Sequence, residues 1–152
     1  LVHYENPLNV VGTIPYSEDR VLLCKRNIEP RKGKWTLPAG FMELAETTAQ
    51  GALRETREEA GADVELGALY TMIDVPHVDQ VHIYYLAHAR SERLDPGPES
   101  LEARYFALAD IPWDKLSFRS VITTLEHYVA DHARGCYRTR QYSLEPYAPM
   151  QP

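Results

Sequence analysis

Three glutamates, Glu55, Glu58 and Glu59, lie close together in a stretch that is predicted to be helical. Because residues three and four apart are neighbours on one face of a helix, these carboxylates converge within a turn. Crowded carboxylates repel one another unless a cation lies between them, and hard oxygen ligands select Mg²⁺ or Mn²⁺ rather than zinc. Since Mg²⁺ bridges to substrate phosphates, the cluster indicates metal-assisted phosphoryl chemistry.

Other residues stand where they can support these glutamates. Arg54 lies four residues before Glu58 and can pair with it on the helix. Glu46, just before the helix, can meet the positive helix start or orient Arg54. Gly40 lies in the loop that leads into the helix, and Gly61 is well placed as the left-handed residue that ends it. The alternative is a solvated surface helix with ordinary ion pairs, and the complete set of positions favours the chemical interpretation.

Apolar runs outside this helix predict a mixed β-sheet. Leu8–Ile14 and Val21–Lys25 are apolar, β-branched runs separated by turn-forming residues, which predicts a β-hairpin. Other strands are expected at residues 35–37, 64–73, 80–89 and 103–108. This order predicts an α+β sandwich, in which helices pack on a mixed sheet.

Two segments carry a helical signal. A capping-box pattern predicts that the first helix starts at Thr47 or Thr48, and Gly61 is expected to end it. Gly51 inside this helix costs about 1 kcal/mol against alanine. It is either a tolerated surface glycine or a point of close backbone packing. Apolar residues at helical spacing predict a second helix over residues 118–133.

The composition is that of an ordinary single-domain protein. The 152 residues are 44% hydrophobic and 25% charged, with a net charge of -6. This acidic balance argues against a surface that coats nucleic acid, and the apolar runs are shorter than the ~20 residues of a membrane span. Cys24 and Cys136 form no disulfide framework and no zinc cluster, so the cytoplasm is the expected location. We expect one domain over residues 1–142 and an irregular, proline-rich tail over residues 143–152.

The stretch from Gly40 to Ala62 resembles the Nudix box, Gx5Ex7REUxEExGU, of the Nudix hydrolases. Every fixed charged and glycine position of that pattern is matched. Thr56 and Ala62 occupy the two U positions, which are usually bulky and aliphatic. Thr56 is a mild departure and Ala62 a smaller one, and neither is a ligand position.

The resemblance extends beyond the box, over residues 4–130. The matching segments are Tyr4 to Pro7, Leu22 to Arg26, Gly33 to Gly40, Pro98 to Glu102, Ile111 to Trp113 and Leu116 to Phe118. They are similar to a subgroup that includes plant FAD pyrophosphatases. Members of that subgroup often carry a four-cysteine zinc ribbon just before the YxNP element, and this chain starts there, at Leu1. A longer native protein trimmed at this point is one interpretation, and a protein without the ribbon is the other.

The resemblance implies an α/β/α Nudix sandwich and hydrolysis of a nucleoside diphosphate linked to a moiety X, giving a nucleotide and X-phosphate. It implies Mg²⁺ as the cofactor, with Mn²⁺ as the alternative. The implied metal ligands are Glu55, Glu58, Glu59 and the backbone carbonyl of Ala39 or Gly40. Arg54 matches the orienting arginine of the family, and Glu46 matches the supporting glutamate.

The general base varies across the family. It is either a glutamate of the box or one on a later loop, and Glu99 and Glu102 are the later candidates here. For these two residues, a pair of solvated loop side chains is the alternative interpretation.

Substrate selectivity is expected outside the box. The SQPWPFPxS element of NADH pyrophosphatases is absent, so FAD, ADP-ribose or a related ADP-linked dinucleotide is favoured over MutT-like nucleotide cleansing. Arg26 and Lys34 belong to a basic loop that can contact a diphosphate, and Trp35 and Phe41 can stack on a base or flavin. Ordinary loop solvation and core packing are the alternatives.

Three functional hypotheses follow. The first is a pyrophosphatase whose partner is a small nucleotide diphosphate, with neither nucleic acid nor a membrane involved, and the resemblance adds a possible homodimer. The second is a non-catalytic Nudix-fold domain that senses a nucleotide or ADP-ribose. Such sensors usually lose box carboxylates, whereas this chain keeps all of them. The third is a structural domain with a charged helix.

Overall fold

Eight strands and two α-helices make up residues 4–146, the part of the chain that the computed structural model describes. Strands β1 (Leu8–Ser17) and β2 (Arg20–Arg26) form the expected hairpin. The remaining strands are β3 (Trp35–Thr36), β4 (Ala39–Phe41), β5 (Val64–Val75), β6 (Gln80–Ala89), β7 (Ser100–Ala107) and β8 (Arg140–Ser143). The helices are α1 (Thr48–Ala60) and α2 (Arg119–Arg134), with short 3-10 turns at Pro76–Val78, Leu108–Asp110 and Trp113–Lys115.

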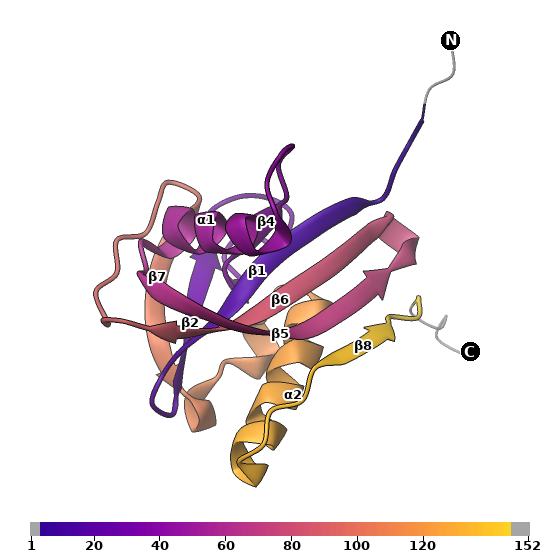
Figure 1. Cartoon of the computed structure of the whole chain (residues 1–152). Coiled ribbons are helices and arrows are strands. Elements are labelled where there is room, and N and C mark those ends of the chain that lie inside the picture. The colour runs from indigo at the N-terminus through magenta and orange to yellow at the C-terminus, as the bar shows by residue number, and fades with distance from the viewer. Residues whose placement is uncertain (1–3, 147–152) are drawn as a thin grey trace, which may run out of the picture.

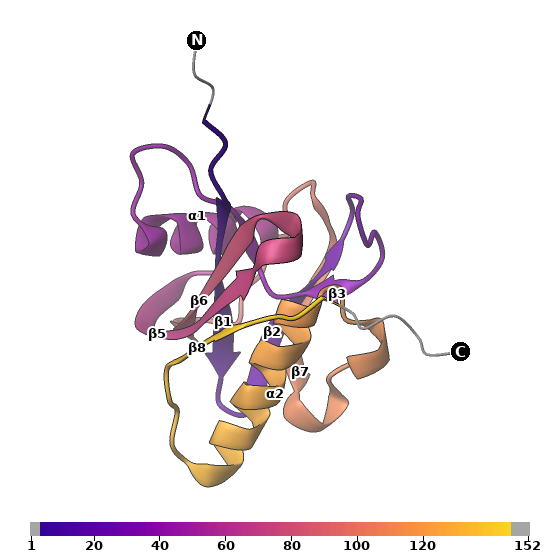
Figure 2. The same ribbon diagram turned by 90° about the vertical axis from the view of Figure 1, so that its right-hand side faces the viewer.

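All eight strands belong to one mixed sheet. Its main path runs β3-β2-β1-β6-β5-β8, with β4 paired to β1 and β7 paired to β2. The pairs β1–β6 and β5–β8 are parallel, and the other pairs are antiparallel. Helix α1 lies over one face of the sheet and α2 over the other (Figure 1 and Figure 2). The predicted sandwich of helices around a mixed sheet is therefore confirmed.

Both ends of α1 are fixed as the sequence predicts. Thr47 is the N-cap: its hydroxyl accepts from the backbone N–H of Gln50 at 3.0 Å, and Gln50 Oε1 accepts from the backbone N–H of Thr47 at 2.8 Å. Gly61 ends the helix with a φ of 63°, in the left-handed region. A Cβ atom there would also lie 2.4 Å from the carbonyl oxygen of Asp95, so conformation and space both require glycine.

Helix α1 lies close to the sheet because its inner face carries small side chains. Gly51, Ala52, Thr56 and Ala60 are all buried. A Cβ atom at Gly51 would lie 2.7 Å from Val11 Cγ2, so any side chain there would push the helix outward. Close backbone packing is therefore the correct interpretation of Gly51.

Helix α2 covers the opposite face with larger side chains. Val121, Leu125 and Tyr128 are buried in the main core, where they pack with residues from several strands. Tyr70 and Tyr84, on β5 and β6, belong to the same core. The bulk of the buried apolar volume therefore lies on the α2 side of the sheet.

Strand β8 was not expected from the sequence, which indicated an irregular tail from residue 143. Residues Arg140–Ser143 pair in parallel with β5, and Leu144 is buried next to Ile73 and Val75. The regular structure therefore continues through the expected domain boundary. The rest of the predicted tail, residues 147–152, lies outside the described residues.

A buried carboxylate joins α2 to β5 and β8. Asp131 is fully buried and accepts from Arg140 Nη2 at 2.6 Å, Arg134 Nη2 at 2.7 Å and Tyr70 Oη at 2.6 Å. The backbone N–H of Arg138 donates to it at 3.2 Å. These hydrogen bonds, the one from Arg140 first, hold the pKa of Asp131 well below its usual range. We call Asp131 with Tyr70, Arg134 and Arg140 the Asp131 cluster.

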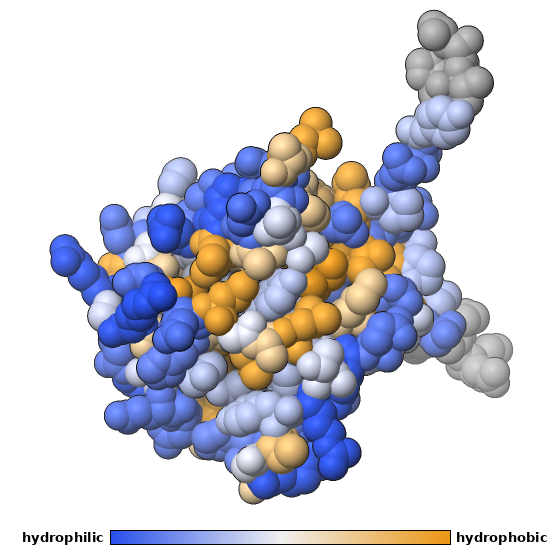
Figure 3. Space-filling model, in the orientation of Figure 1, coloured by the Kyte–Doolittle hydropathy of each residue, from blue (hydrophilic) through white to orange (hydrophobic). Residues whose placement is uncertain are grey.

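Apolar side chains gather over the middle of the face seen in Figure 3, on the strands beside α1. On β5 and β6, Leu69, Val81 and Tyr85 are partly buried and Met72 is exposed. Apolar areas of this kind are where proteins associate.

In residues 4–146, no helix is both long and apolar enough to cross a membrane.

Candidate active site

Arg54, in the middle of α1, is the centre of a network of carboxylates. It donates twice to Glu46, from Nε to Oε2 at 3.0 Å and from Nη2 to Oε1 at 2.7 Å. Its Nη1 donates to Glu55 Oε1 at 2.7 Å and to Glu58 Oε2 at 3.2 Å. Nη2 also donates to the carbonyl of Phe41 at 3.1 Å, which ties β4 to the helix. We call Arg54 with Glu46, Glu55, Glu58 and the adjacent Glu59 the Arg54 cluster.

This network keeps one glutamate firmly ionised. The hydrogen bonds from Arg54 lower the pKa of Glu46 to about 2. In return, the bonds to Glu46 raise the pKa of Arg54, so the guanidinium is always charged. Glu46 also accepts from the backbone N–H of Glu43 at 2.8 Å, which fixes the loop before α1. The predicted role of Glu46 in orienting Arg54 agrees with this geometry.

Glu55 and Glu59 lie one turn apart on the inner side of α1. Glu55 is 8% exposed, and Glu59 Oε2 accepts from the backbone N–H of Ala39 at 3.2 Å. Burial raises the pKa of both carboxyls, that of Glu59 to about 9, with the charge of Glu55 as the next cause. A Cβ atom at Gly40 would lie 2.3 Å from Glu55 Cδ, so only glycine leaves room for this carboxylate. Two acidic groups are thus held together where burial opposes their charge.

The donor set beside Gly40 suits a hard divalent cation. Glu55 and Glu59 supply carboxylate oxygens, and a cation would offset the burial and repulsion that raise their pKa values. Glu58 is the exception, because it is exposed and paired with Arg54. Within residues 4–146, no three acidic, histidine or cysteine side chains surround one point. The three-glutamate ligand set expected from the sequence is therefore only partly assembled.

A cleft of about 940 Å³ opens beside these carboxylates. That volume is in the range of sites that enclose a small ligand. Residues from β4, α1, the loop after β2 and the start of α2 line it, among them Arg26, Ala39, Gly40, Phe41, Glu55, Glu59, His82, Tyr84, Glu99, Ser117, Arg119 and Ser120. The lining therefore joins acidic groups from α1 to polar groups on the α2 side of the sheet.

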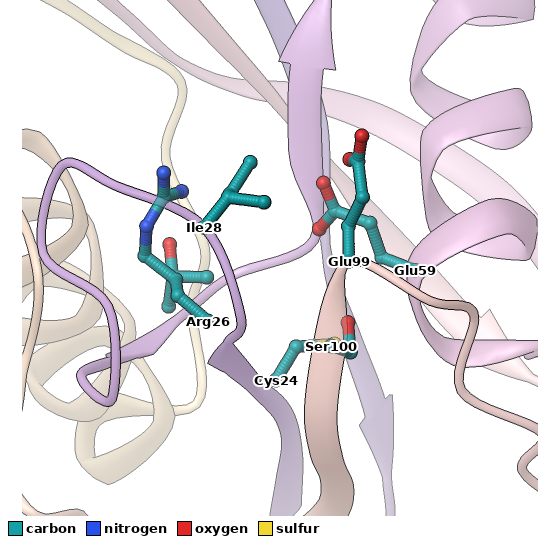
Figure 4. Close-up of a pocket in the computed structure, with 7 residues that line it drawn as sticks. Cys24, Arg26, Ile28, Glu59, Glu99 and Ser100 are labelled. Atoms are coloured by element: carbon teal, nitrogen blue, oxygen red, sulfur yellow. The ribbon is translucent and has the colours of Figure 1, made fainter.

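A second cavity, of about 10 Å³, is lined by several of the same residues. Figure 4 shows Cys24, Arg26, Ile28, Glu59, Glu99 and Ser100 around it. Because Glu99 and Glu59 line both spaces, the loop before β7 brings Glu99 to the carboxylates of α1. Burial raises the pKa of Cys24, so its thiol is neutral.

Glu102, the other expected general base, lies elsewhere. It pairs with Lys25 across the β2–β7 ladder and lies 3.8 Å from Arg104 Nε. Since side chains alternate along a strand, Glu102 shares a face with Arg104 and Phe106, and Phe106 packs in the core on the α2 side. Glu102 does not line the cleft, so the two later glutamates are separated by the start of β7.

Of the four residues expected to contact the substrate, only two line the cleft. Arg26 and Phe41 line the cleft, and Phe41 is 53% exposed. Trp35 does not: it is 6% exposed and packs edge-on against Phe106, with ring centroids 4.9 Å apart. Trp35 therefore packs in the core, as the alternative interpretation of this residue expected. Lys34 does not line the cleft, and its backbone carbonyl accepts from the backbone N–H of Arg26 at 2.9 Å.

A polar group in the cleft was not expected from the sequence. His82 Nδ1 lies 2.6 Å from Ser120 Oγ, and Nε2 lies 2.8 Å from Gln80 Oε1. Burial lowers the pKa of His82 to about 4, so its ring is neutral, with Nε2–H donating to Gln80 and Nδ1 accepting from Ser120. The available signal was two polar residues at alternate positions of an otherwise apolar strand. Ser120 carries no such signal, because only the fold brings it to β6.

The chain matches the profile of the NUDIX domain over residues 6–125. It is 31% identical over 119 residues to an ADP-ribose pyrophosphatase of Methanocaldococcus jannaschii, covering 76% of this chain and 69% of that protein. It is also 33% identical over 96 residues to the NAD-capped RNA hydrolase NudC of Salmonella typhi, covering 62% of this chain and 37% of the relative.

Solved structures agree with the sequence matches. The fold superimposes on a NUDIX hydrolase crystal structure from Nitrosomonas europaea with a TM-score of 0.92 and 45% identity, covering 95% of this chain and 82% of that one. An ADP-ribose pyrophosphatase from Streptococcus suis, at 20% identity and a TM-score of 0.69, shares the fold over 91% of this chain and 99% of that one. Sequence and structure therefore point to the same group of proteins.

Proposed function

Because the chain belongs to the Nudix hydrolase family, we propose that it cleaves the diphosphate bond of a nucleoside diphosphate linked to another moiety. The products are a nucleoside monophosphate and the phosphorylated moiety. One observation carries this proposal: Glu55 lies against Gly40 and Glu59 against Ala39, both in the lining of a cleft of about 940 Å³. A negatively charged diphosphate can enter such a site only when a cation neutralises it.

We infer that the cation is Mg²⁺, with Mn²⁺ as a substitute. Glu55, Glu59 and the backbone carbonyl of Gly40 or Ala39 would hold it, with Glu58 as a further ligand. When bound, a divalent cation neutralises diphosphate charge and lowers the pKa of a bound water. Glu58 is held by a single exposed ion pair of 3.2 Å with Arg54, an interaction worth little energy. Glu58 can therefore exchange Arg54 for another partner at small cost.

The other residues of the cluster have supporting roles in this proposal. Arg54 positions Glu55 and Glu58, and Glu46 holds Arg54 in place by the two hydrogen bonds of their side chains. Among the later glutamates, Glu99 is our candidate general base because it lines the cleft and Glu102 does not. Arg26 is the candidate diphosphate contact, and Phe41, exposed in the lining, is the candidate stacking surface.

We propose ADP-ribose, FAD or a related ADP-linked dinucleotide as the substrate. The relative from Methanocaldococcus jannaschii is named an ADP-ribose pyrophosphatase, which supports the first of these. The test is incubation of the pure protein with FAD, ADP-ribose, NADH, Ap₄A and deoxynucleoside triphosphates plus Mg²⁺, with detection of AMP and phosphate products. We expect AMP from an ADP-linked compound. No turnover of any compound in the panel, with either Mg²⁺ or Mn²⁺, would contradict the proposal.

A sensing domain would behave differently in the same experiment. It would bind ADP-ribose without releasing AMP, and Mn²⁺ would still raise its melting temperature. A purely structural domain would show no metal-dependent shift of that temperature.

We further propose that the enzyme acts in the cytoplasm as a homodimer. Both described cysteines are free thiols, as expected in a reducing compartment. The apolar area on β5 and β6 in Figure 3 is the surface that a second copy would cover. Light scattering that gives the mass of one chain at micromolar concentration would contradict the dimer.

A further inference from the structure

Gln80, on β6, presents an amide group to the cleft on the α2 side of the sheet. It is partly buried and lines the cleft, as do His82 and Tyr84 at alternate positions of the same strand. Its Oε1 lies 2.8 Å from His82 Nε2. Within residues 4–146 its NH₂ group has no partner, yet this group is not buried, so its two donor protons are accessible from the cleft.

A chain of hydrogen bonds fixes which way this amide points. Burial keeps the ring of His82 neutral by lowering its pKa to about 4. Because Gln80 offers its oxygen, the ring carries its proton on Nε2, and Nδ1 accepts from Ser120 Oγ at 2.6 Å. The single proton of Ser120 is thereby used, so the buried hydroxyl of Tyr84, which also hydrogen-bonds Ser120, donates to it. Every donor of the chain therefore points toward Gln80, and hydrogen bonds aligned in this way strengthen one another.

Apolar side chains lie next to Gln80 in the lining of the cleft. Val75 pairs directly with Gln80 across the β5–β6 ladder, and Leu144 packs against Val75. Ile122, two residues after Ser120 on α2, also lines the cleft. The acidic lining residues come instead from α1 and from the loops before β3, β7 and α1. An apolar surface with one oriented amide suits a flat aromatic ring that carries polar atoms at its edge.

Strand registers place Gln80 relative to the carboxylate side of the cleft. Phe41, Val10 and His82 are direct neighbours across β4, β1 and β6, and adjacent strands are about 4.8 Å apart. Gln80 lies two residues from His82, about 6.6 Å further along β6. Its backbone is therefore roughly 12 Å from that of Phe41, which follows Gly40. Since a ribose separates the base of a nucleotide from its diphosphate, one ADP group can extend from the carboxylates to Gln80.

We propose that Gln80 recognises the adenine base of the substrate, and that His82 positions its amide. Nε2 of Gln80 donates to a ring nitrogen of adenine, and the second lone pair of Oε1 accepts from the neighbouring 6-amino group. A glutamine amide pairs with this base in the same bidentate way in nucleic acids. The inference rests on the proposed function, and it assigns the ADP half of the dinucleotide to the α2 side of the cleft.

Binding can be tested without turnover or metal, with adenosine as the probe. ¹⁵N-labelled protein is titrated with adenosine and with purine riboside, which differs only by lacking the 6-amino group, and the side-chain amide signals of Gln80 are followed. We expect saturable shifts of these signals with adenosine, and binding of purine riboside that is weaker by about fivefold or more. Absent or non-saturating shifts, or equal affinity for the two nucleosides, would overturn the assignment.

Two variants of Gln80 and a matched control extend this test. Gln80→Leu removes the amide, and Gln80→Glu keeps an oxygen for His82 but loses the donor, so both should bind the two nucleosides equally. Gln141→Leu replaces an exposed glutamine on β8, outside the cleft, and should keep the preference of wild type. A preference for adenosine that survives in both Gln80 variants would contradict the proposal.

The positioning role of His82 has a spectroscopic readout. Nitrogen chemical shifts of its ring should show a proton on Nε2 and none on Nδ1 at neutral pH. His82→Phe removes both ring nitrogens, so the amide of Gln80 is free to turn and the preference for adenosine should fall to about twofold or less. A proton on Nδ1 in wild type, or an undiminished preference in His82→Phe, would show that His82 does not orient Gln80.

Turnover separates this inference from the proposed function. With ADP-ribose and Mg²⁺, Gln80→Leu should lower kcat/KM by about fivefold or more, mainly through KM, whereas Gln141→Leu should leave it unchanged. Adenosine binding at Gln80 without hydrolysis of any compound would leave the adenine site standing and overturn the pyrophosphatase. Hydrolysis with unchanged kinetics in Gln80→Leu would do the reverse.

Discussion

The Arg54 cluster and the Asp131 cluster are both built from arginine and carboxylate, yet their balance of charge is opposite. One arginine faces several glutamates in the first. In the second, one buried aspartate is bound by two arginines and a tyrosine. The pKa of Glu59 is raised to about 9, mainly by burial, whereas hydrogen bonds, with Arg140 first, hold that of Asp131 low. The Arg54 cluster has more carboxylates than arginines and therefore needs a further cation. The Asp131 cluster has more arginines than carboxylates, so its buried carboxylate needs no further partner.

The largest effect is expected from removing one charge of the Arg54 cluster. Glu59→Gln keeps the shape of the side chain and removes a proposed metal ligand, so kcat/KM should fall about ten-thousandfold, equivalent to about 5.5 kcal/mol. The melting temperature should stay the same or rise, because burial already opposes that charge. Steady-state kinetics and a thermal melt measure both. Glu102→Gln, outside the cleft, should change neither, and a Glu59→Gln enzyme of normal activity would end the comparison.

Replacing the carboxylate of the Asp131 cluster with an amide should have the opposite result: stability should fall and activity should stay nearly unchanged. Asp131→Asn leaves Arg140 and Arg134 without their carboxylate, so the free energy of unfolding should fall by about 4 kcal/mol. At 15 °C, where the variant is still folded, kcat/KM should remain within about twofold of wild type. Urea denaturation and low-temperature kinetics provide the readouts. A strong loss of activity with normal stability would show that the two clusters are not separable.

Measuring stability against pH sharpens the contrast between the cleft and the Asp131 cluster, because it gives the contribution of His82 alone. Its pKa is lowered to about 4 by burial, from an ordinary value of 6.5, so between these values the unfolded chain binds the proton more tightly. Stability should therefore fall as pH drops from 6.5 to 4, by at most about 3 kcal/mol for this group. Asp131 remains ionised over that window. The difference between wild type and His82→Gln gives the contribution of His82, and parallel curves for the two proteins would contradict it.

The smallest expected effect concerns the packing that holds the Arg54 cluster against the sheet. At Gly51, a Cβ atom would lie 2.7 Å from Val11 Cγ2 and 2.8 Å from Glu46 Oε1. Gly51→Ala gains about 1 kcal/mol of helix propensity and loses about 2–3 kcal/mol to overpacking, a net loss of about 1–2 kcal/mol. Chemical denaturation measures the net change in the free energy of unfolding. A more stable variant would mean that α1 can move outward freely.

The residues whose roles were predicted correctly from the sequence interact with residues close to them in the chain. The capping box at Thr47, the glycine at position 61 and the pairing of Arg54 with Glu46 and Glu58 depend on helix geometry that neighbouring residues determine. These features are confirmed. Strands β1 and β2 were predicted for the same reason, since a turn-forming segment separates two apolar runs.

Features that depend on distant partners were not predictable in the same way. Trp35 has the same local pattern whether it faces a ligand or Phe106, and only the pairing of β2 with β7 decides this. Strand β8 is short and polar, and it exists because β5 offers an edge and Asp131 binds Arg140. The packing of α2 brings Ser120 to His82 on β6, and the segment before α2 brings Ser117 to Trp35 on β3, which no local signal encodes.

The departure at position 56 has a consequence for how this sequence can change. Thr56 is fully buried, and its hydroxyl lies 2.6 Å from that of Thr13 on β1 and 2.7 Å from the carbonyl of Ala52. Replacing Thr13 alone with valine would leave Thr56 with one partner fewer, and replacing Thr56 alone would isolate Thr13. The two positions should therefore be inherited as a pair, so that homologues with an aliphatic residue at one also have one at the other. An alignment of close homologues would then show correlated substitution across the interface between α1 and the sheet.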